Sequence, residues 1–490
     1  MHSSALGGRQ ILRHIARIAM IERGMQPEFP PAAMREAAAM KDAAHPAPGD
    51  TVRDLRDLPW VSIDNDDSRD LDQLSAAEAL GDGASRVLVA IADVDGLVRP
   101  DSPLDDHARH NTTSVYTAAR VFPMLPERLS TDLTSLGEGS ERLAVVADMV
   151  VTAEGHVQSS DLYRALVRNH AKLAYPAVAA WLEGSAPPPP AVRAQNLESQ
   201  LRLQDAVAQS LRTQRHRHGA LTLETLKTHA VFNGDALHEL LPDRKSRAHE
   251  LIEDLMIAAN GAAARFLDRQ RFPSLRRVLR TPKRWERIVA LAAEVGEQLP
   301  AAADALALNA FLARRRRADP ERFADLSLAV VKSLGSGEYV AEPAGAPPPG
   351  HFGLAVSDYT HSSAPNRRYP DLISQRLIKA ALAARRCPYS TETLEALAAH
   401  CTAQEDNAAK VERRVAKSAA ALLLSHRVGE EFPALVTGAA SKGTWVRIVH
   451  PAVEGRLMRG FEGTDIGHRL RVRLVRVDVE RGFIDFERVG

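Results

Sequence analysis

The stretch SIDNDDSRDLDQ, residues 62–73, is the densest acidic segment of the chain, and it holds Asp64, Asp66, Asp67, Asp70 and Asp72. Carboxylates crowded in this way repel one another, so the segment is favourable only when it is solvated or holds cations. Trp60 to Ile63, just before it, have the composition of a short β-strand. A strand that delivers Asp64 to the start of an acidic loop would bring several carboxylates to one point.

Three interpretations fit this loop. A solvated acidic turn is the plainest. An EF-hand calcium loop would use Asp64, Asp66 and Ser68, but it needs Gly at its sixth position and Glu at its twelfth, where this chain has Arg69 and Ser75. The EF-hand is therefore rejected. The third interpretation is a catalytic Mg²⁺ site, because hard carboxylate oxygens suit Mg²⁺ and substrate phosphate completes its shell. The residues alone leave the first and third interpretations open.

The bulk composition is that of a globular protein. The chain has 490 residues, of which 45% are hydrophobic and 26% are charged, and this length allows about two to four domains. The net charge of +1 means that nucleic acid would have to bind local basic patches. Cys387 and Cys401 form no CxxC pair, as expected of a cytoplasmic protein. No apolar run approaches the roughly 20 residues of a membrane helix, so no membrane partner is expected.

The N-terminal segment has two interpretations. Its first 21 residues contain no Asp or Glu and several arginines, which also suits an organellar transit peptide. The apolar stripe of Ile11, Ile15 and Ile18 favours an amphipathic helix instead. A second helix should begin at Pro30-Pro31, with proline in its first turn. We predict a small helical domain over residues 1–48, with a helix-turn-helix as a weaker alternative.

The remaining composition predicts an α+β multidomain protein, with strands and long helices over residues 50–426. A buried strand is expected at 87–92 and a hairpin over 143–157 that turns at Glu154-Gly155. Helical periodicity is clearest over 192–212, 246–270, 282–295, 369–386 and 391–426.

Residues 430–490 change to short alternating strands separated by Gly turns. About 60 residues of this kind fit a five-stranded OB barrel. By strict alternation, Arg471 and Arg473 share one face of a strand and Arg476 lies on the other. RNA binding is favoured over a solvated strand face, because OB folds pair basic grooves with stacking platforms.

Several stretches, in this order along the chain, resemble the ribonuclease II/ribonuclease R family and its RNB domain. The family pattern TID…(x)DLDDA resembles residues 62–73, and its HFGL…YTHFTSPIRRYPDL stretch resembles HFGLAVSDYTHSSAPNRRYPDLISQRL, residues 351–377. Further similar stretches are IADVDGLVRPDSPLDDHAR (91–109), TSVYTAARVFPMLPERLSTDLTSL (113–136) and, more weakly, LIEDLMIAAN (251–260). The resemblance spans residues 55–425. It implies an RNB catalytic domain, built from a mixed sheet with long helices, followed by the OB barrel.

The resemblance implies catalytic roles for specific residues. Asp64, Asp70 and Asp72 match three of the four family aspartates that act as catalytic residues and hold Mg²⁺, with Mn²⁺ as an alternative. Gln73 stands at the fourth position, where an amide oxygen still coordinates a metal but carries no charge, so weaker metal binding or slower turnover is expected. Arg367 matches the arginine that contacts the scissile phosphate, in preference to a helix-capping role.

Other matches imply RNA-binding roles. Tyr116 matches an aromatic that stacks on a base, with a core tyrosine as the alternative, and Leu223 takes the place of the family's opposing phenylalanine. Tyr175 and Glu253 match residues tied to selecting RNA over DNA, although Glu253 equally suits a helix face. Glu412 matches a glutamate at the terminal nucleotide, and an i,i+4 salt bridge is its alternative. A further match, Arg368, either binds RNA or lies on a helix surface.

The implied function is a 3′-to-5′ exoribonuclease that hydrolyses single-stranded RNA with Mg²⁺ and needs no obligate protein partner. Gln73 and Leu223 motivate an alternative, a catalytically weakened protein that mainly binds RNA. A DNA-binding regulator that uses the N-terminal helices is a second alternative. The family's two cold-shock OB domains do not fit ahead of residue 62, so we expect both to be absent and replaced by the small helical segment.

Overall fold

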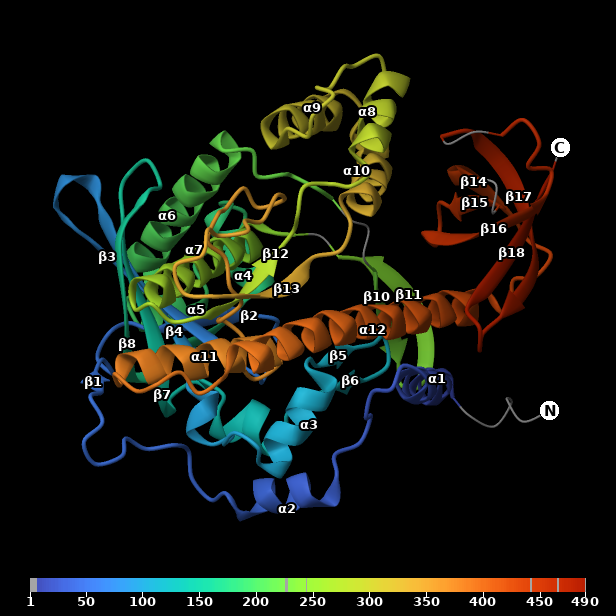
Figure 1. The fold of residues 1–490 in the computed structure, drawn as a ribbon. Helices are drawn as coiled ribbons and strands as arrows, with labels where there is room; N and C mark the ends of the chain where they lie inside the picture. The colour runs from blue at the N-terminus through green and yellow to red at the C-terminus, as the bar shows by residue number, and fades with distance from the viewer. Residues whose placement is uncertain (1–6, 225–227, 244, 441–442, 465–466, 490) are drawn as a thin grey trace.

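A computed structural model describes residues 7–224, 228–243, 245–440, 443–464 and 467–489. Figure 1 shows a large body that contains a β-sheet and its covering helices, a helical lobe above it, and a small barrel at one end. The long helix α12 (Thr391–Leu424) runs from the body to the barrel. This arrangement confirms the expected α+β multidomain fold.

The body is built on a seven-stranded mixed sheet in the order β1-β8-β7-β4-β3-β2-β9. Its neighbours are antiparallel except for two parallel pairs, β1 with β8 and β2 with β9. The predicted strand at 87–92 and the hairpin over 143–157 are confirmed as β4 and as β7 with β8. The strands are β1 (Arg53–Asp54), β2 (Val61–Asp64), β3 (Gln73–Ala79), β4 (Ser85–Ala92), β7 (Glu141–Val151), β8 (Val157–Arg168) and β9 (Ala171–Ala174).

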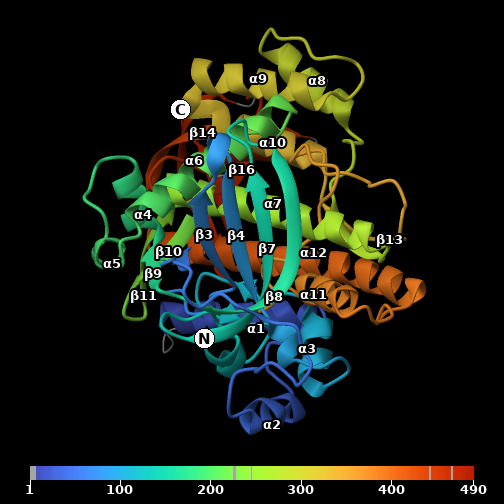
Figure 2. The same cartoon turned by 90° about the vertical axis from the view of Figure 1, so that its left-hand side faces the viewer.

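The sheet is covered because its central strands are apolar on both faces, as nearly every residue of β4 is buried. Helices α6 and α7 contact its strands, and Figure 2 shows α7 crossing the sheet. The helices of the body and lobe are α3 (Pro103–Asn111), α4 (Tyr175–Leu182), α5 (Pro190–Ala194), α6 (Glu198–Arg217), α7 (Arg247–Arg269), α8 (Trp285–Glu294), α9 (Ala305–Ala318), α10 (Pro320–Leu334) and α11 (Tyr369–Leu382).

One predicted helix is divided in two. The periodic segment 192–212 forms the end of α5 and most of α6, and Asn196 between them has φ 58°. Asn adopts this left-handed conformation more readily than most side chains do. The conformation interrupts the helical hydrogen bonds, so the helix is divided at this residue. Three small two-stranded sheets complete the body: β5 (Val115–Tyr116) with β6 (Val121–Phe122), β10 (Thr228–Asn233) with β11 (Ala236–Pro242), and β12 (Ser274–Val278) with β13 (Glu338–Glu342).

The N-terminal segment forms the two expected helices, α1 (Gly8–Glu22) and α2 (Pro31–Ala39). Leu12 and Ile15 on α1 are buried in one apolar cluster with the end of α12 and the barrel. Helix α2 contacts α3 instead. Each helix therefore packs on the body, and the limit of an N-terminal domain at residue 48 stays a prediction.

His107 on α3 lies beneath this N-terminal segment. Its Nδ1 is 3.1 Å from Gln26 Oε1, and its ring centroid is 4.4 Å from that of Phe29. The side chain is almost fully buried, and burial lowers the pKa of His107 to about 4, with a smaller contribution from His110. The histidine is therefore neutral in the folded protein under conditions in which an unfolded chain would bind a proton.

Stability is expected to fall on acidification through this window. Below about pH 6.5 His107 binds a proton in the unfolded chain, whereas in the folded protein it does so only near pH 4. Between these two pH values the free energy of unfolding falls by up to about 1.4 kcal/mol per pH unit. His107→Gln should weaken this dependence in urea unfolding curves measured from pH 7.5 to 4.5. An unchanged slope in the variant would assign the acid sensitivity to other groups, such as His351, whose pKa burial also lowers to about 4.

Five strands that lie between residues 431 and 488 form a closed barrel, which confirms the predicted OB architecture. The bulge between Leu474 and Arg476 corrects one prediction, because Arg476 pairs with Asp485 and is exposed. The extra residue restores the outward direction, so Arg476 lies on the same side as Arg471 and Arg473. The strands are β14 (Glu431–Ala440), β15 (Gly443–Ile448), β16 (Val453–Arg459), β17 (Arg469–Asp478) and β18 (Phe483–Arg488).

The arginine row on β17 is already partly neutralised within the barrel. Arg473 contacts Glu431 at 2.8 Å and Glu487 at 3.4 Å, and Arg471 lies 3.8 Å from Glu431. Partnered surface arginines are weaker phosphate ligands than free ones, because RNA must displace a carboxylate. RNA binding by this row stays a prediction.

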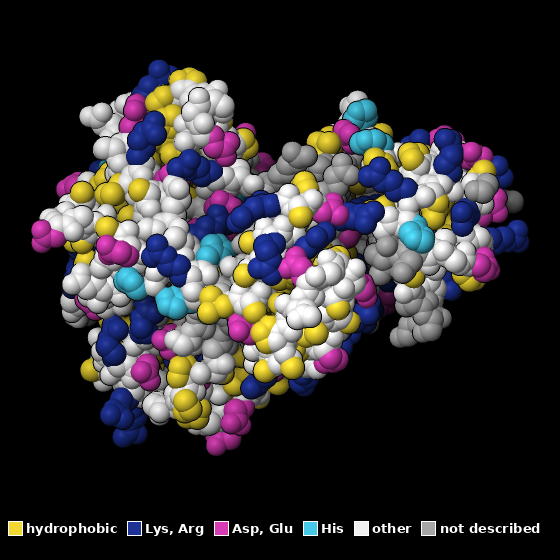
Figure 3. All heavy atoms as spheres, turned by 90° about the horizontal axis from the view of Figure 1, so that it is seen from above, with side chains coloured by type: hydrophobic (Ala, Val, Ile, Leu, Met, Phe, Trp, Pro, Cys, Tyr) yellow, Lys and Arg dark blue, Asp and Glu magenta, His cyan; other side chains and the backbone are white. Residues whose placement is uncertain are grey.

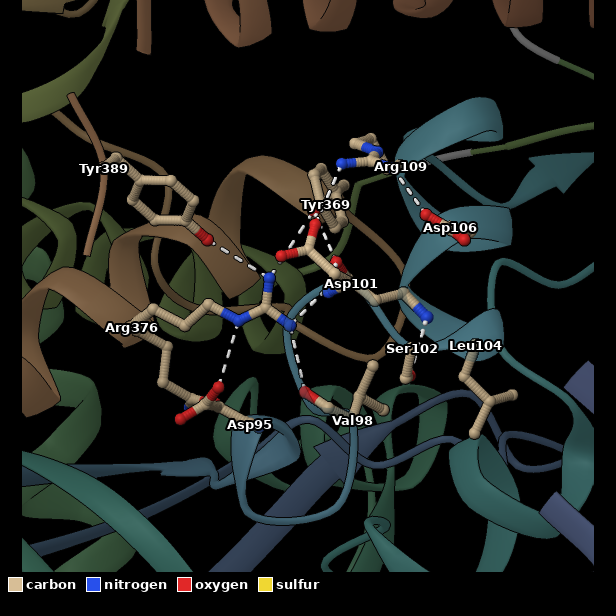
Figure 4. A network of polar contacts seen from close by, with 12 residues as sticks. Asp95, Val98, Asp101, Ser102, Leu104, Asp106, Arg109, Tyr369, Arg376 and Tyr389 are labelled. Carbon is tan, nitrogen blue, oxygen red and sulfur yellow. Dashed lines mark hydrogen bonds and ion pairs between the residues drawn. The ribbon is translucent and has the colours of Figure 1, made fainter. Parts of the chain in front are cut away.

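Helix α11 is held to the sheet side of the body by a buried charged cluster, shown in Figure 4. The Arg376 guanidinium is 3% exposed and donates to Asp95 Oδ1 at 3.0 Å, to the Val98 carbonyl at 2.9 Å and to the Tyr389 hydroxyl at 3.1 Å. It also pairs with Asp105 Oδ1 at 2.8 Å. The first residue of α11 follows directly on the segment that carries Arg367, so this anchor fixes one side of the site described below.

In the part of the chain that the structure describes, no helix has the length and apolar character needed to cross a membrane.

Candidate active site

One pocket gathers most of the residues singled out from the sequence. It is bounded by the end of β2 and the acidic loop, by β5, by the start of α4, by one face of α7 and by the segment before α11. Its walls include eight of the predicted site residues: Asp64, Asp70, Gln73, Tyr116, Tyr175, Glu253, Arg367 and Arg368. Segments almost 300 residues apart therefore meet here.

The acidic loop presents only some of its carboxylates to the pocket. Asp64, at the end of β2, accepts hydrogen bonds from Asn65 N at 2.7 Å and Ser68 Oγ at 2.9 Å, and Asp70 follows on the pocket wall. Asp66 and Asp67 are exposed and lie outside this wall. A uniformly solvated turn does not describe this loop, because two of its carboxylates are held facing other charged groups.

Asp72 lies beneath the pocket and anchors the arginine of the opposite wall. Its carboxylate is 1% exposed and accepts from Asn366 N and from Arg367 Nε, each at 3.0 Å. Burial raises the pKa of Asp72, whereas the Arg367 guanidinium and the Asn366 N–H lower it. The Arg367 side chain itself remains 40% exposed, so its outer nitrogens are available to a ligand.

The carboxylates also influence one another. Burial raises the pKa of Asp70, and the charge of Asp64 raises it further, while Arg367 and the Tyr116 hydroxyl lower it. Desolvation of the Tyr116 hydroxyl raises its pKa, and the charges of Asp70, Asp72 and Asp64 raise it further, while Arg367 lowers it. The acidic groups and Tyr116 line the same pocket and lie within electrostatic reach of each other, as a site for cations requires.

The pocket offers oxygen donors of the kind that a divalent ion needs. Among the described residues, no three His, Cys, Asp or Glu side chains form a ready-made metal cluster. Two carboxylates, Asp64 and Asp70, and the amide of Gln73 nevertheless line the same pocket. Mg²⁺ is commonly held by one or two carboxylates while water and substrate phosphate fill the other positions, so this set fits Mg²⁺. Both oxygens of Asp72 already accept hydrogen bonds, and its role as a metal ligand stays a prediction.

Tyr116 lines the pocket and is partly exposed, and its role in base stacking stays a prediction. Its side chain on β5 is 44% exposed, unlike a core tyrosine, and its backbone N donates to Glu412 Oε1 at 2.9 Å. Glu412 comes from α12, so it fixes the strand that carries Tyr116. This contact differs from the i,i+4 helical pair considered as its alternative.

The remaining predicted residues are distributed differently. Tyr175 begins α4 and faces the pocket, and Glu253 on α7 pairs with Lys245 at 2.7 Å. Arg368 lines the pocket and forms an ion pair with the buried Asp371 at 2.7 Å. It is therefore not an unpaired cation on a helix surface. Leu223 packs against the apolar cluster of the α8–α10 lobe and does not line the pocket.

Sequence reasoning missed a row of residues on α7. His249, Ile252, Met256 and Asn260 all line the pocket, at spacings of three and four. The weak match over 251–260 pointed to this helix, and its periodicity identifies the face. The partner of Asp72 in the buried hydrogen bond, Asn366, was also missed.

The fold and pocket thus define an α+β protein with an acidic, arginine-backed cleft and a C-terminal barrel. The RNB domain model matches residues 52–384, and the model of the RNase II-type exonuclease C-terminal S1 domain matches residues 430–489. The chain belongs to the RNB family.

Curated relatives include ribonucleases R of two bacteria. The one from Vibrio parahaemolyticus is 33% identical over 477 residues, which cover 89% of this chain and 56% of the relative. The one from Escherichia coli is 31% identical over 505 residues, which cover 94% and 60%. The chain therefore spans little more than half the length of these relatives.

Solved structures share the fold. Mycoplasma genitalium RNase R in complex with ribose methylated single-stranded RNA has a TM-score of 0.87 at 23% identity, over 98% of this chain and 78% of that one. Yeast Ssd1, described as a pseudonuclease, has a TM-score of 0.72 at 16% identity, over 91% and 55%. The same fold thus occurs in a protein named as a nuclease and in one named as a pseudonuclease. Whether this chain is catalytically active therefore depends on the residues in its own pocket.

Proposed function

We propose that the chain is a 3′-to-5′ exoribonuclease that hydrolyses single-stranded RNA with Mg²⁺, for which Mn²⁺ is an alternative. The observation that carries the proposal is the convergence of Asp64, Asp70, Tyr116 and Arg367 on one pocket. The ribonuclease R relatives support the activity. The RNA held by the M. genitalium structure supports the substrate class.

The charge distribution also suits an RNA strand. Figure 3 shows Lys and Arg side chains gathered across the middle of the face seen from above. A local basic surface attracts phosphates even though the net charge of the chain is only +1.

The chain's own residues would divide the work of hydrolysis. Tyr116 stacks on a base and holds the terminal nucleotide, and Asp72 orients Arg367 so that its exposed nitrogens reach the phosphate oxygens. Asp64, Asp70 and Gln73 would hold the divalent ion. When bound, such an ion activates water and neutralises charge on the leaving oxygen. Water oxygen bonds to phosphorus, the phosphorus–O3′ bond breaks, and the freed O3′ takes a proton.

The proposal is tested with a 20-nucleotide RNA labelled at its 5′ end. We expect progressive shortening from the 3′ end when Mg²⁺ is present and none when it is chelated. Shortening that continues in the presence of a chelator would contradict the role of Mg²⁺. Cleavage inside the strand, without the series of products shortened one by one from the 3′ end, would contradict exonucleolytic hydrolysis.

A weakened, RNA-binding protein is the second candidate, favoured by Gln73 at a position where the family has a metal-binding aspartate. Gln73 lines the pocket through its neutral amide. This candidate predicts tight RNA binding together with turnover that is slow at every Mg²⁺ concentration.

Gln73→Asp is expected to lower the Mg²⁺ concentration for half-maximal rate by about tenfold, because a carboxylate adds charge to a site of hard oxygen ligands. The measurement is initial rate against Mg²⁺ concentration. Gln73→Asn, which keeps a neutral amide, serves as the matched control. An unchanged Mg²⁺ dependence in Gln73→Asp would place residue 73 outside the metal's ligand shell.

A further inference from the structure

His249 lines the pocket, although no motif in the sequence pointed to it. It begins the pocket-lining row of α7 and is half-buried. Its ring stacks on that of Tyr175, with centroids 3.9 Å apart and planes inclined by 15°. Tyr175 begins a different helix, so the stacked pair joins α4 to α7 at the pocket wall.

The hydrogen bonds of His249 define which ring nitrogen carries the proton. Ser246 caps α7, and its backbone N lies 3.3 Å from His249 Nδ1, while its hydroxyl lies 2.8 Å from the same atom. A backbone N–H only donates, so Nδ1 is the acceptor and the neutral ring carries its proton on Nε2. Burial and the charge of Lys245 lower the pKa of His249, which favours this neutral form.

Both hydrogen bonds of the His249 ring among the described residues are made by Nδ1, which leaves the Nε2–H donor of this pocket-lining side chain for a ligand. On the same face of α7, one turn further on, lies Glu253, whose carboxylate accepts hydrogen bonds even while it pairs with Lys245. The wall therefore combines a neutral donor with an acceptor. A hydroxyl group, which donates one hydrogen bond and accepts others, matches this combination.

We propose that His249 is a specificity-determining residue that donates Nε2–H to the 2′-oxygen of a nucleotide in the pocket while its ring holds Tyr175 in place. The 2′-hydroxyl donates in turn to Glu253. A ribose hydroxyl suits this neutral donor better than a phosphate, because Arg367 serves the anion on another wall. DNA, which lacks the 2′-oxygen, would leave the donor unpaired. This inference rests on the proposed function.

The test combines protein variants with modified RNA. The substrates are an all-RNA 20-mer and a series with a single 2′-deoxy nucleotide at each of the last five positions. Wild type should slow at one position of the series. His249→Phe keeps the stacked ring but lacks the donor, and it should lose about fivefold in rate on all-RNA while changing little on the RNA with the deoxy nucleotide at that position.

Two further variants separate the donor from the scaffold. His249→Gln restores an N–H donor without the ring, and should regain part of the 2′ discrimination. His218→Phe is the control, because His218 directly follows α6 and lies outside this pocket. This variant should behave as wild type. An equal loss on both substrates in His249→Phe would show a merely structural role and overturn the proposal.

Failure of the proposed function gives a different pattern. A wild-type chain that releases no nucleotides refutes the nuclease, and the same variants are then compared by fluorescence anisotropy binding to the labelled oligomers. If His249→Phe, and not the His218→Phe control, binds all-RNA and the 2′-deoxy oligomers equally while wild type prefers all-RNA, His249 is still supported as the residue that contacts the 2′-oxygen. Equal affinity of wild type for all of the oligomers overturns it.

Discussion

Asp72→Asn is expected to reduce RNA hydrolysis by about 10³-fold while single-stranded RNA still binds. The carboxylate accepts from both Asn366 N and Arg367 Nε, and it is the buried counter-charge of that arginine. An asparagine has only one acceptor atom, so one of the two donors would meet an N–H₂ group instead. Arg367 would then lose its orientation toward the phosphate, and the acidic site would lose one charge.

The measurement is single-turnover release from labelled RNA together with the dissociation constant for the same oligomer. Asp67→Asn is the matched control, because Asp67 belongs to the same loop but is exposed outside the pocket. The control should retain wild-type rate. Near wild-type hydrolysis by Asp72→Asn would show that Arg367 needs no anchor and that Asp72 holds no essential metal.

Replacing Arg376 by Met is expected to destabilise the body of the protein by about 3–5 kcal/mol, which lowers its thermal midpoint by about 3–6 °C. Among the described residues, Arg376 supplies the guanidinium that pairs with Asp105, and its removal leaves that carboxylate buried. Asp95 retains Lys379 at 2.7 Å as a second partner, so the uncompensated charge is that of Asp105. Breaking a buried ion pair on one side is far more costly than losing a surface pair.

Differential scanning calorimetry measures the effect, and Arg386→Met, an exposed arginine beyond the end of α11, is the control. The double variant Arg376→Met/Asp105→Asn should recover part of the loss, because the orphaned charge is gone. A double variant less stable than Arg376→Met alone would show that the cost arises from lost packing and not from the buried charge.

Much of the fold was predictable because its signals are local. The strand before Asp64, the long helix that becomes α12 and the terminal barrel all follow from periodicity and turn residues. Tyr116 and Arg367 were identified through motifs, whose order along the chain carried the family resemblance. The structure adds that these residues line a single pocket.

The parts that escaped prediction depend on contacts between distant segments. Asp72 and Arg367 are 295 positions apart, and no sequence pattern shows that one anchors the other. The bulge at Arg476 changes the facing of a side chain by one inserted residue, which strict alternation does not register. Leu223 was assigned by motif spacing to the base-stacking position, but its apolar side chain packs in the helical lobe.

The most direct test of the central claim is mass-spectrometric analysis of the products that wild type and Asp72→Asn release from an all-RNA 20-mer with excess Mg²⁺. The account predicts nucleotides released from the 3′ end by wild type, loss of nearly all release when Mg²⁺ is chelated, and almost none from Asp72→Asn. Retained RNA binding by wild type with no release at any Mg²⁺ concentration would contradict it and leave an RNA-binding protein.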